Sequence, residues 1–335
     1  MDAAQPTPPS APARRGRPEP VDAGALEALL ERMYAEDLGW PESAWDDLSG
    51  GVPAEWLECD LTTASGVPAE ARAEALLRVK ASGVLAGLDV FARAFTKLDP
   101  SIECELRATD GQRLAPGQIV ARLEGPARAL LVAERTALNL VQRMSGVATL
   151  TQAFVDAVEG TDARVLDTRK TTPGLRFLER YAVRVGGGEN HRYGLFDEVL
   201  IKDNHADLAG LEDGSERAAA LVAAARERFA ERVRVVCEAR DGVAARGALR
   251  AGADVLLLDN FEPAELSGLI PELRALAAEL GRSVELEASG GLTLETVGEY
   301  ARCGVDRLSI GALTHSAKAL DLSLALQPLK VGAHP

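Results

Sequence analysis

The sequence predicts an α/β protein whose second half is built from repeated parallel βα units. Short apolar segments alternate there with helix-like stretches, and these segments are residues 165–166, 199–201, 233–236, 255–258, 284–286 and 308–310. This alternation is typical of a parallel sheet connected by helices. Each segment runs directly into polar or glycine-rich sequence, and in parallel α/β barrels the chemistry lies at such carboxyl ends of strands. A doubly wound open sheet has the same period, so the spacing alone does not distinguish it from a barrel.

The part of the chain before residue 160 has a mixed pattern. An amphipathic helix begins near Leu26, period-two alternation predicts a strand over 102–106, and 118–123 has the character of the next strand. Residues 126–158 are helix-like in one or two pieces, and Gly146 is the expected break if there are two. The change of rhythm after this helix marks the start of the βα units.

Composition and charge exclude several classes of protein. The 335 residues suit one large domain or two ordinary ones, and 47% hydrophobic with 26% charged residues is typical of a globular chain. A net charge of −14 argues against a nucleic-acid binder or adsorption to an anionic membrane. The longest apolar run, residues 218–225, is far shorter than the about 20 residues of a membrane span.

The cysteines and the N-terminal segment indicate a cytoplasmic protein. Cys59, Cys104, Cys237 and Cys303 form no CxxC pair and have no histidine at ligand spacing, which disfavours a structural zinc site. Four scattered thiols are expected to stay reduced in the cytoplasm. Residues 1–20 lack the apolar core of a signal peptide, and we expect them to form a disordered tail.

Positive side chains gather where the overall charge is negative. Within 34 residues lie the strand-end and loop residues Arg169, Lys170, His191, Arg192 and Lys202. Arg169 and Lys170 alone would also suit a surface pair that meets acidic residues. The glycines at 186–188, just before His191, suggest a loop whose backbone closely approaches something. Together these features favour a small polyanionic ligand.

Carboxylates and small residues follow the later strands. Glu238 and Asp259 suit Mg²⁺, which binds oxygen ligands and bridges to substrate phosphates, although either residue would also suit a helix N-cap. A phosphate cradle is expected from the last βα loops, at Ser289, Gly290, Gly291, Gly311 and His315. His315 would equally suit a helix cap. Since no activated nucleophile stands out, we expect catalysis by positioning and electrostatics.

Seven motifs, in order along the chain, resemble the quinolinate phosphoribosyltransferases, also called nicotinate-nucleotide pyrophosphorylases (carboxylating). They occupy residues 134–139, 167–174, 186–192, 201–205, 258–260, 287–291 and 311–316. The resemblance runs from about Leu26 to Leu326. It implies transfer of phosphoribosyl from 5-phosphoribosyl-1-pyrophosphate to quinolinate with Mg²⁺, giving nicotinate mononucleotide, pyrophosphate and CO₂. This reaction is the entry to de novo NAD synthesis.

The resemblance also implies an architecture. An N-terminal α/β sandwich over 21–133, joined by the returning segment 316–335, would stand beside an open, incomplete parallel α/β barrel over 134–315. This is the type II phosphoribosyltransferase-like fold. The active site would form at the interface of a homodimer, and assembly beyond the dimer is left open.

The resemblance assigns roles to the candidate residues. The quinolinate carboxylates would be bound by Arg169, His191, Arg192 and, from the neighbouring subunit, Arg135, with Lys170 and Lys202 between quinolinate and phosphoribosyl groups. The catalytic residues would be Lys170, Lys202, Glu238 and Asp259. Glu238 and Asp259 would also face the ribose and hold Mg²⁺ directly or through water. The phosphoribosyl phosphate would be bound by Ser289, Gly290, Gly291, Gly311 and His315.

Two departures and two alternatives accompany this assignment. One acidic position expected in the strand before Glu238 is apolar here, and the 206–232 segment is longer than expected. A paralogue of the same fold with another acceptor is the nearest alternative, but the paired cations favour quinolinate. A non-catalytic sensor of NAD precursors is the second alternative, and the retained Glu238 and Asp259 argue against it.

Overall fold

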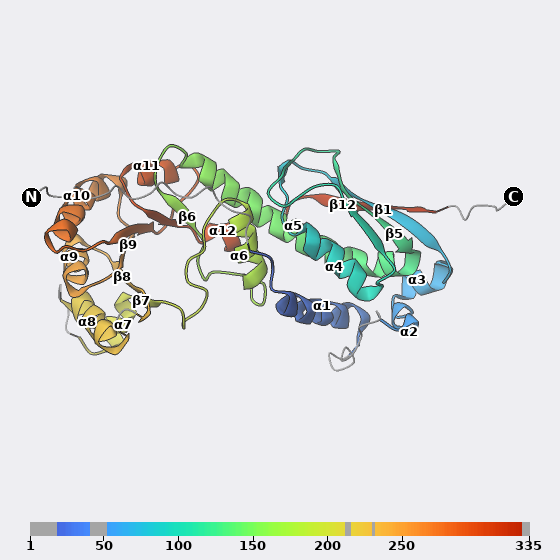
Figure 1. The fold of residues 1–335 in the computed structure, drawn as a ribbon, viewed down its shortest axis with the longest axis horizontal. Helices are drawn as coiled ribbons and strands as arrows, with labels where there is room; N and C mark the ends of the chain where they lie inside the picture. The colour runs from blue at the N-terminus through green and yellow to red at the C-terminus, as the bar shows by residue number, and fades with distance from the viewer. Residues whose placement is uncertain (1–18, 41–51, 212–215, 230–231, 330–335) are drawn as a thin grey trace, which may run out of the picture.

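The computed structural model describes residues 19–40, 52–211, 216–229 and 232–329 (Figure 1). The predicted tail, residues 1–20, lies outside the described residues except for Glu19 and Pro20. Within the described residues, no helix combines the length and the apolar character needed to cross a bilayer.

The second half of the chain forms a six-stranded parallel sheet, which confirms the predicted α/β class. Its strands are β6 (Arg164–Leu166), β7 (Val199–Ile201), β8 (Val235–Ala239), β9 (Val255–Asp259), β10 (Glu285–Ser289) and β11 (Arg307–Ser309). All six predicted segments are strands. The order is β6-β11-β10-β9-β8-β7, so the first strand pairs with the last and the others follow in chain order. This order is a ring opened between β6 and β7, and it corresponds to the incomplete barrel rather than to a doubly wound sheet.

Helices follow the strands of this sheet. They are α6 (Arg176–Val185), α7 (Asp203–Leu208), α8 (Arg217–Phe229), α9 (Gly242–Ala251), α10 (Pro263–Glu279), α11 (Val297–Arg302) and α12 (Ala312–His315). Alternation along the strands directs Leu256 of β9 into the main core, whereas Val236, Val255 and Leu257 form a separate buried cluster with Leu200. Val236 is therefore part of a small buried apolar cluster formed by side chains of neighbouring strands.

The first half of the chain forms a second, antiparallel sheet of order β12-β1-β5-β3. Its strands are β1 (Arg72–Val79), β3 (Glu103–Leu106), β5 (Ile119–Pro126) and β12 (Leu322–Pro328), and β2 (Gly83–Val84) pairs separately with β4 (Arg113–Leu114). The helices here are α1 (Ala23–Leu38), α2 (Ala54–Leu57), α3 (Leu61–Gly66) and α4 (Leu88–Leu98). The C-terminal strand β12 runs beside β1, from Val79 opposite Leu322 to Ala73 opposite Pro328 (Figure 1).

One long helix, α5 (Ala127–Ala157), links the two halves (Figure 1). It continues through Gly146, so the expected break is absent and the glycine has another purpose. A Cβ at Gly146 would lie 2.0 Å from the carbonyl oxygen of Lys318. The returning C-terminal segment passes against the helix at this point, and only glycine leaves room for its backbone. The boundary predicted at 133/134 lies inside α5.

Candidate active site

A cavity of about 860 Å³ lies at the carboxyl ends of the parallel strands. The predicted residues that line it are Arg169, Lys170, His191, Arg192, Lys202, Glu238, Asp259, Ser289, Gly290, Gly291, Gly311 and His315. The barrel thus brings together side chains from six strand ends. Their individual roles stay predictions. Arg135 is the exception: its side chain on α5 is 65% exposed, lies 3.7 Å from Glu134, and is not among the residues that line this cavity.

Asp167, fully buried at the end of β6, anchors the loop that carries His191. It accepts hydrogen bonds from the backbone N–H of His191 (2.7 Å) and the side chain of Asn190 (2.6 Å), and Arg180 lies 3.5 Å away. Burial raises the pKa of Asp167 to about 6, although the charge of Arg180 and these hydrogen bonds act in the opposite direction. The contacts fix the positions of the β6 loop and the His191 loop relative to each other.

The raised pKa predicts a pH-dependent effect of Asp167→Asn. The folded protein binds the proton more tightly than the unfolded chain, so this group favours folding below about pH 4 and the contribution is lost as pH rises through 6. The variant lacks this titration. Its stability deficit against the wild type should shrink by up to roughly 3 kcal/mol between pH 4 and pH 7. Urea unfolding of both proteins across this range measures the difference, and a constant deficit would contradict the assignment.

Gly186 and Gly188 approach α5 and do not line the cavity. A Cβ at Gly186 would lie 2.4 Å from the carbonyl oxygen of Ala148, and one at Gly188 would lie 2.8 Å from the side chain of Thr151. The expected close approach is therefore confirmed, but the partner is a helix of the protein itself. This packing lets the chain return from α6 to the cavity wall at His191.

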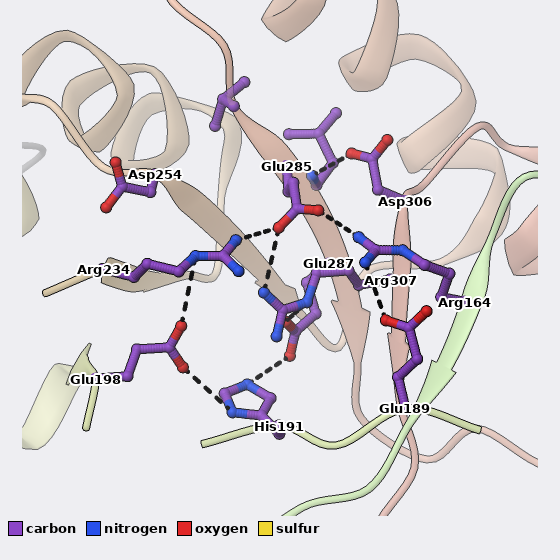
Figure 2. Close-up of polar contacts among 12 residues, drawn as sticks. Arg164, Glu189, His191, Glu198, Arg234, Asp254, Glu285, Glu287, Asp306 and Arg307 are labelled. Atoms are coloured by element: carbon purple, nitrogen blue, oxygen red, sulfur yellow. Dashed lines mark hydrogen bonds and ion pairs between the residues drawn. The ribbon is translucent and has the colours of Figure 1, made fainter. Parts of the chain in front are cut away.

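The protein itself engages both ring nitrogens of His191 (Figure 2). The backbone N–H of Arg192 donates to Nδ1 (2.8 Å), and Nε2 lies 3.2 Å from Oε1 of Glu287. Glu198 also approaches Nδ1, at 3.5 Å. Direct donation from His191 to quinolinate, as the resemblance implies, would require Nε2–H to leave Glu287. In the present geometry the imidazole fixes the position of Arg192.

An ionic network continues from His191 between the strands (Figure 2). Arg307 of β11 lies 2.9 Å from Glu287 and 3.4 Å from Glu285, and Glu285 also pairs with Arg164 and Arg234. Burial alone would raise the pKa of Glu287, but its contacts with His191, Arg307 and Ser309 lower it overall. Glu287 therefore stays anionic beneath the cation-rich side of the cavity.

The carboxylate side of the cavity is partly neutralised by neighbouring cations. Lys202 Nζ lies 3.0 Å from Glu238, and the backbone N–H of Lys202 donates to Nδ1 of His205 (2.8 Å). Asp259 accepts a hydrogen bond from the side chain of Asn260 (2.7 Å). The alternative interpretation of Glu238 and Asp259 as helix caps is wrong. The N-cap residue of α9 is Asp241, and that of α10 is Glu262.

Glu238 and Asp259 have the oxygen donors that Mg²⁺ prefers. Among the described residues, no group of three or more His, Cys, Asp or Glu side chains is arranged to hold a metal ion. Two carboxylates at the ends of the neighbouring strands β8 and β9 are nevertheless the usual protein contribution to a Mg²⁺–phosphate complex, in which water and phosphate supply the other ligands. The donor set thus fits a metal shared with phosphates.

Gly311 and His315, which were predicted to bind phosphate, adjoin the cationic side of the cavity. A Cβ at Gly311 would lie 3.0 Å from Lys170 Cδ and 3.1 Å from His315 Nε2, so both side chains flank this residue. The hydroxyl of Thr314 donates to the carbonyl of Lys170 (2.8 Å). His315 is the last residue of α12 and is followed by β12, so the alternative of a cap for a following helix is wrong.

A buried ion pair joins the loop after β6 to the loop after β11. Glu179 of α6 is fully buried and accepts hydrogen bonds from Arg143 of α5 (2.6 Å) and from the backbone and hydroxyl of Thr172 (3.0 and 2.7 Å). Arg143 in turn donates to the carbonyls of Ala317 (2.7 Å) and Thr314. The loop after β6 and the loop after β11 are thus held by one pair of side chains.

Several residues that line the cavity received no role from the sequence, among them Arg240, Asn260 and Glu287. For two of these three, the two-residue period of a strand could have pointed to the site. Glu287 precedes Ser289 by two positions and Arg240 follows Glu238 by two, so both lie on the same face as a predicted residue. Asn260 has a positive φ of 59°, which no pattern in the sequence predicts.

Comparisons with known proteins agree with this geometry. The chain matches the quinolinate phosphoribosyl transferase C-terminal domain over residues 147–325 and the N-terminal domain over 60–145. It is 40% identical over 300 residues to the probable nicotinate-nucleotide pyrophosphorylase [carboxylating] of Bacillus subtilis, covering 89% of this chain and 92% of that protein. It is 44% identical over 274 residues to the nicotinate-nucleotide pyrophosphorylase [carboxylating] of Mycobacterium leprae, with 80% and 91% covered.

The fold is shared with a solved relative. The crystal structure of NadC from Streptococcus pyogenes superimposes with a TM-score of 0.80 at 33% identity, covering 93% of this chain and all of the other. The match therefore includes both sheets and α5. On these similarities, the chain belongs to the quinolinate phosphoribosyltransferase family.

Proposed function

We infer that the protein transfers phosphoribosyl from 5-phosphoribosyl-1-pyrophosphate to quinolinate with loss of CO₂, giving nicotinate mononucleotide and pyrophosphate. The observation that carries this proposal is one cavity with two chemical sides. Arg169, Lys170 and Arg192 line one side, and Glu238 with Asp259 lines the other. A pyridine dicarboxylate suits the first side, and a ribose with a metal-bound pyrophosphate suits the second.

The residues would act by orientation and charge. Departing pyrophosphate takes the electron pair of the C1–O bond, and the quinolinate nitrogen forms the new bond to C1. Lys170 and Lys202 would stabilise the charge that grows on the leaving group. Mg²⁺, held by Glu238 and Asp259 directly or through water, would supply further charge stabilisation there. The pyridinium then takes the electrons of the C2–carboxylate bond, CO₂ leaves, and C2 takes a proton.

A coupled assay tests the reaction. Quinolinate labelled in the 2-carboxyl group is mixed with phosphoribosyl pyrophosphate, Mg²⁺ and the protein. Nicotinate mononucleotide and labelled CO₂ in equal amounts, lost on addition of EDTA, are expected. Binding of quinolinate without turnover would favour the sensor. Absence of both would favour a paralogue with another acceptor.

Asp259→Asn tests the carboxylate side. The change keeps the shape but removes one of the two charges available to Mg²⁺, so we expect the KM for phosphoribosyl pyrophosphate and the Mg²⁺ requirement to rise about tenfold or more. The KM for quinolinate should change little. Initial rates over a grid of both substrates and Mg²⁺ measure the three effects. Equal losses for both substrates would contradict the assignment.

A homodimer that shares its sites is part of the proposal, and the exposed side chain of Arg135 supports it. Arg135 would reach the cavity of a second copy. Arg135→Ala and Lys202→Ala should each be nearly inactive alone, whereas a mixture refolded together should regain activity. Mixed dimers contain one site with both residues intact. No recovery in a mixture shown to contain mixed dimers would contradict the shared site.

A location in the cytoplasm stays a proposal, and the state of the cysteines supports it. Cys59, Cys104, Cys237 and Cys303 are all free, as expected in a reducing compartment.

A further inference from the structure

Arg240 stands at the mouth of the cavity without an assigned role. It directly follows β8, and its side chain is 62% exposed. It lines the main cavity and also a neighbouring cavity of about 560 Å³. Lys202 and Glu238 form the rest of the wall that the two cavities share. The guanidinium therefore has open space on both sides.

The partners of Arg240 are three carboxylates from three strand ends. Its Nε lies 2.8 Å from Asp203 at the start of α7 and 4.0 Å from Asp259, and its Nη2 lies 3.8 Å from Glu238. The closest of these pairs, with Asp203, joins two partly exposed side chains and contributes little to stability, so this pair does not account for a cation here. Its electrostatic effect is to offset three like charges that would otherwise repel one another and any incoming anion.

The proposed reaction brings a pyrophosphate to these carboxylates. Even with Mg²⁺ bound, a pyrophosphate ester retains charge and acceptor oxygens that the carboxylates cannot satisfy. The planar fork of an arginine matches phosphate oxygens in a two-point contact. Lys202, another cation of this wall, is already paired with Glu238 at 3.0 Å.

We propose that Arg240 binds the pyrophosphate group of phosphoribosyl pyrophosphate, exchanging Asp203 for phosphate oxygens when the substrate arrives. This inference rests on the proposed function and names one more binding residue for its leaving group. It also accounts for the position of Asp203, which holds the guanidinium at the cavity mouth before the substrate binds.

Titration calorimetry with Mg²⁺ and inorganic pyrophosphate tests the proposal without turnover. Arg240→Gln should weaken binding roughly tenfold to a hundredfold, and Arg240→Lys should lose less. Arg246→Gln is the matched control, because Arg246 pairs with Glu272 (3.0 Å) between α9 and α10 and should leave binding unchanged. In steady state, Arg240→Gln should raise the KM for phosphoribosyl pyrophosphate and leave that for quinolinate unchanged.

Unchanged or tighter pyrophosphate binding by a folded Arg240→Gln protein would overturn the proposal. Tighter binding would mean that Arg240 merely competes with Mg²⁺ for the carboxylates. The experiments distinguish a failure of the proposed function from a failure of the role of Arg240. If the wild type does not form nicotinate mononucleotide, the proposed function fails. If the wild type is active and Arg240→Gln binds pyrophosphate as well as the wild type, only the role of Arg240 fails.

Discussion

Arg169→Ala is expected to weaken quinolinate binding roughly tenfold to a hundredfold and to leave phosphoribosyl pyrophosphate binding nearly unchanged. Arg169 and Arg192 approach each other on one side of the cavity. Burial lowers the pKa of Arg192, and the charge of Arg169 lowers it further. Two guanidinium groups that repel each other in a partly buried wall would be stabilised by an anion between them. A dicarboxylate would satisfy both, and alanine would leave one carboxylate without its strongest partner.

Calorimetric titration with each ligand measures the two affinities. Arg113→Ala is a suitable control for the loss of a positive charge, since Arg113 of β4 pairs with Asp156 near the end of α5 (2.7 Å) and its charge is largely exposed. We expect this control to bind both ligands as the wild type does. Equal loss of both ligands in Arg169→Ala would refute the placement of quinolinate beside Arg169.

Arg143→Ala is expected to cost about 3–5 kcal/mol of folding free energy, because it leaves Glu179 buried and unpaired. The same change removes the link between the loop after β6 and the loop after β11, so kcat/KM should also fall. Urea unfolding measures the first effect, and steady-state kinetics on the folded fraction measure the second. A stability loss below about 1 kcal/mol would show that the pair is not a structural link.

A double variant separates the stability cost of an unpaired buried charge from the loss of the link between the two loops. Arg143→Met with Glu179→Gln removes both charges and keeps the volumes similar, so it should recover much of the lost stability. The amide oxygen of Gln would still accept from Thr172, but Met cannot reach the carbonyls of Thr314 and Ala317. If the pair positions the loops, activity stays low despite the recovered stability. If activity returns with stability, the role of Arg143 is only structural.

The spacing of apolar segments predicted the local elements of the barrel well, but it did not predict which strands pair with each other. Each strand was visible because a short apolar run ends in polar sequence within a few residues. The pairing of β6 with β11 was not visible, since it joins segments about 140 residues apart and leaves no local periodicity. The sequence left open whether the helix continues through Gly146, because the residue that decides it, Lys318, lies far along the chain.

In the candidate site, too, local features were predictable from the sequence and distant contacts were not. Arg169, Lys202 and Asp259 were predicted because they follow strand ends, where parallel strands place chemistry. The contact between His191 and Glu287 joins residues 96 positions apart, and no pattern at the level of the sequence reports it. That contact gives the imidazole its present role in fixing Arg192. The motif therefore identified the residue but not its hydrogen-bond partners.

The pairing of β12 with β1 gives the folding of the chain an order in time. In synthesis from the N-terminus, β1 and β5 leave the ribosome before the parallel sheet, whereas β12 follows after it. Until then β1 presents an uncovered row of backbone donors and acceptors, to which a neighbouring nascent chain can add a strand. The nascent chain thus passes through a stage in which the barrel has been synthesised but one edge of β1 is still unpaired. Chaperone binding would prevent aggregation most effectively at this stage.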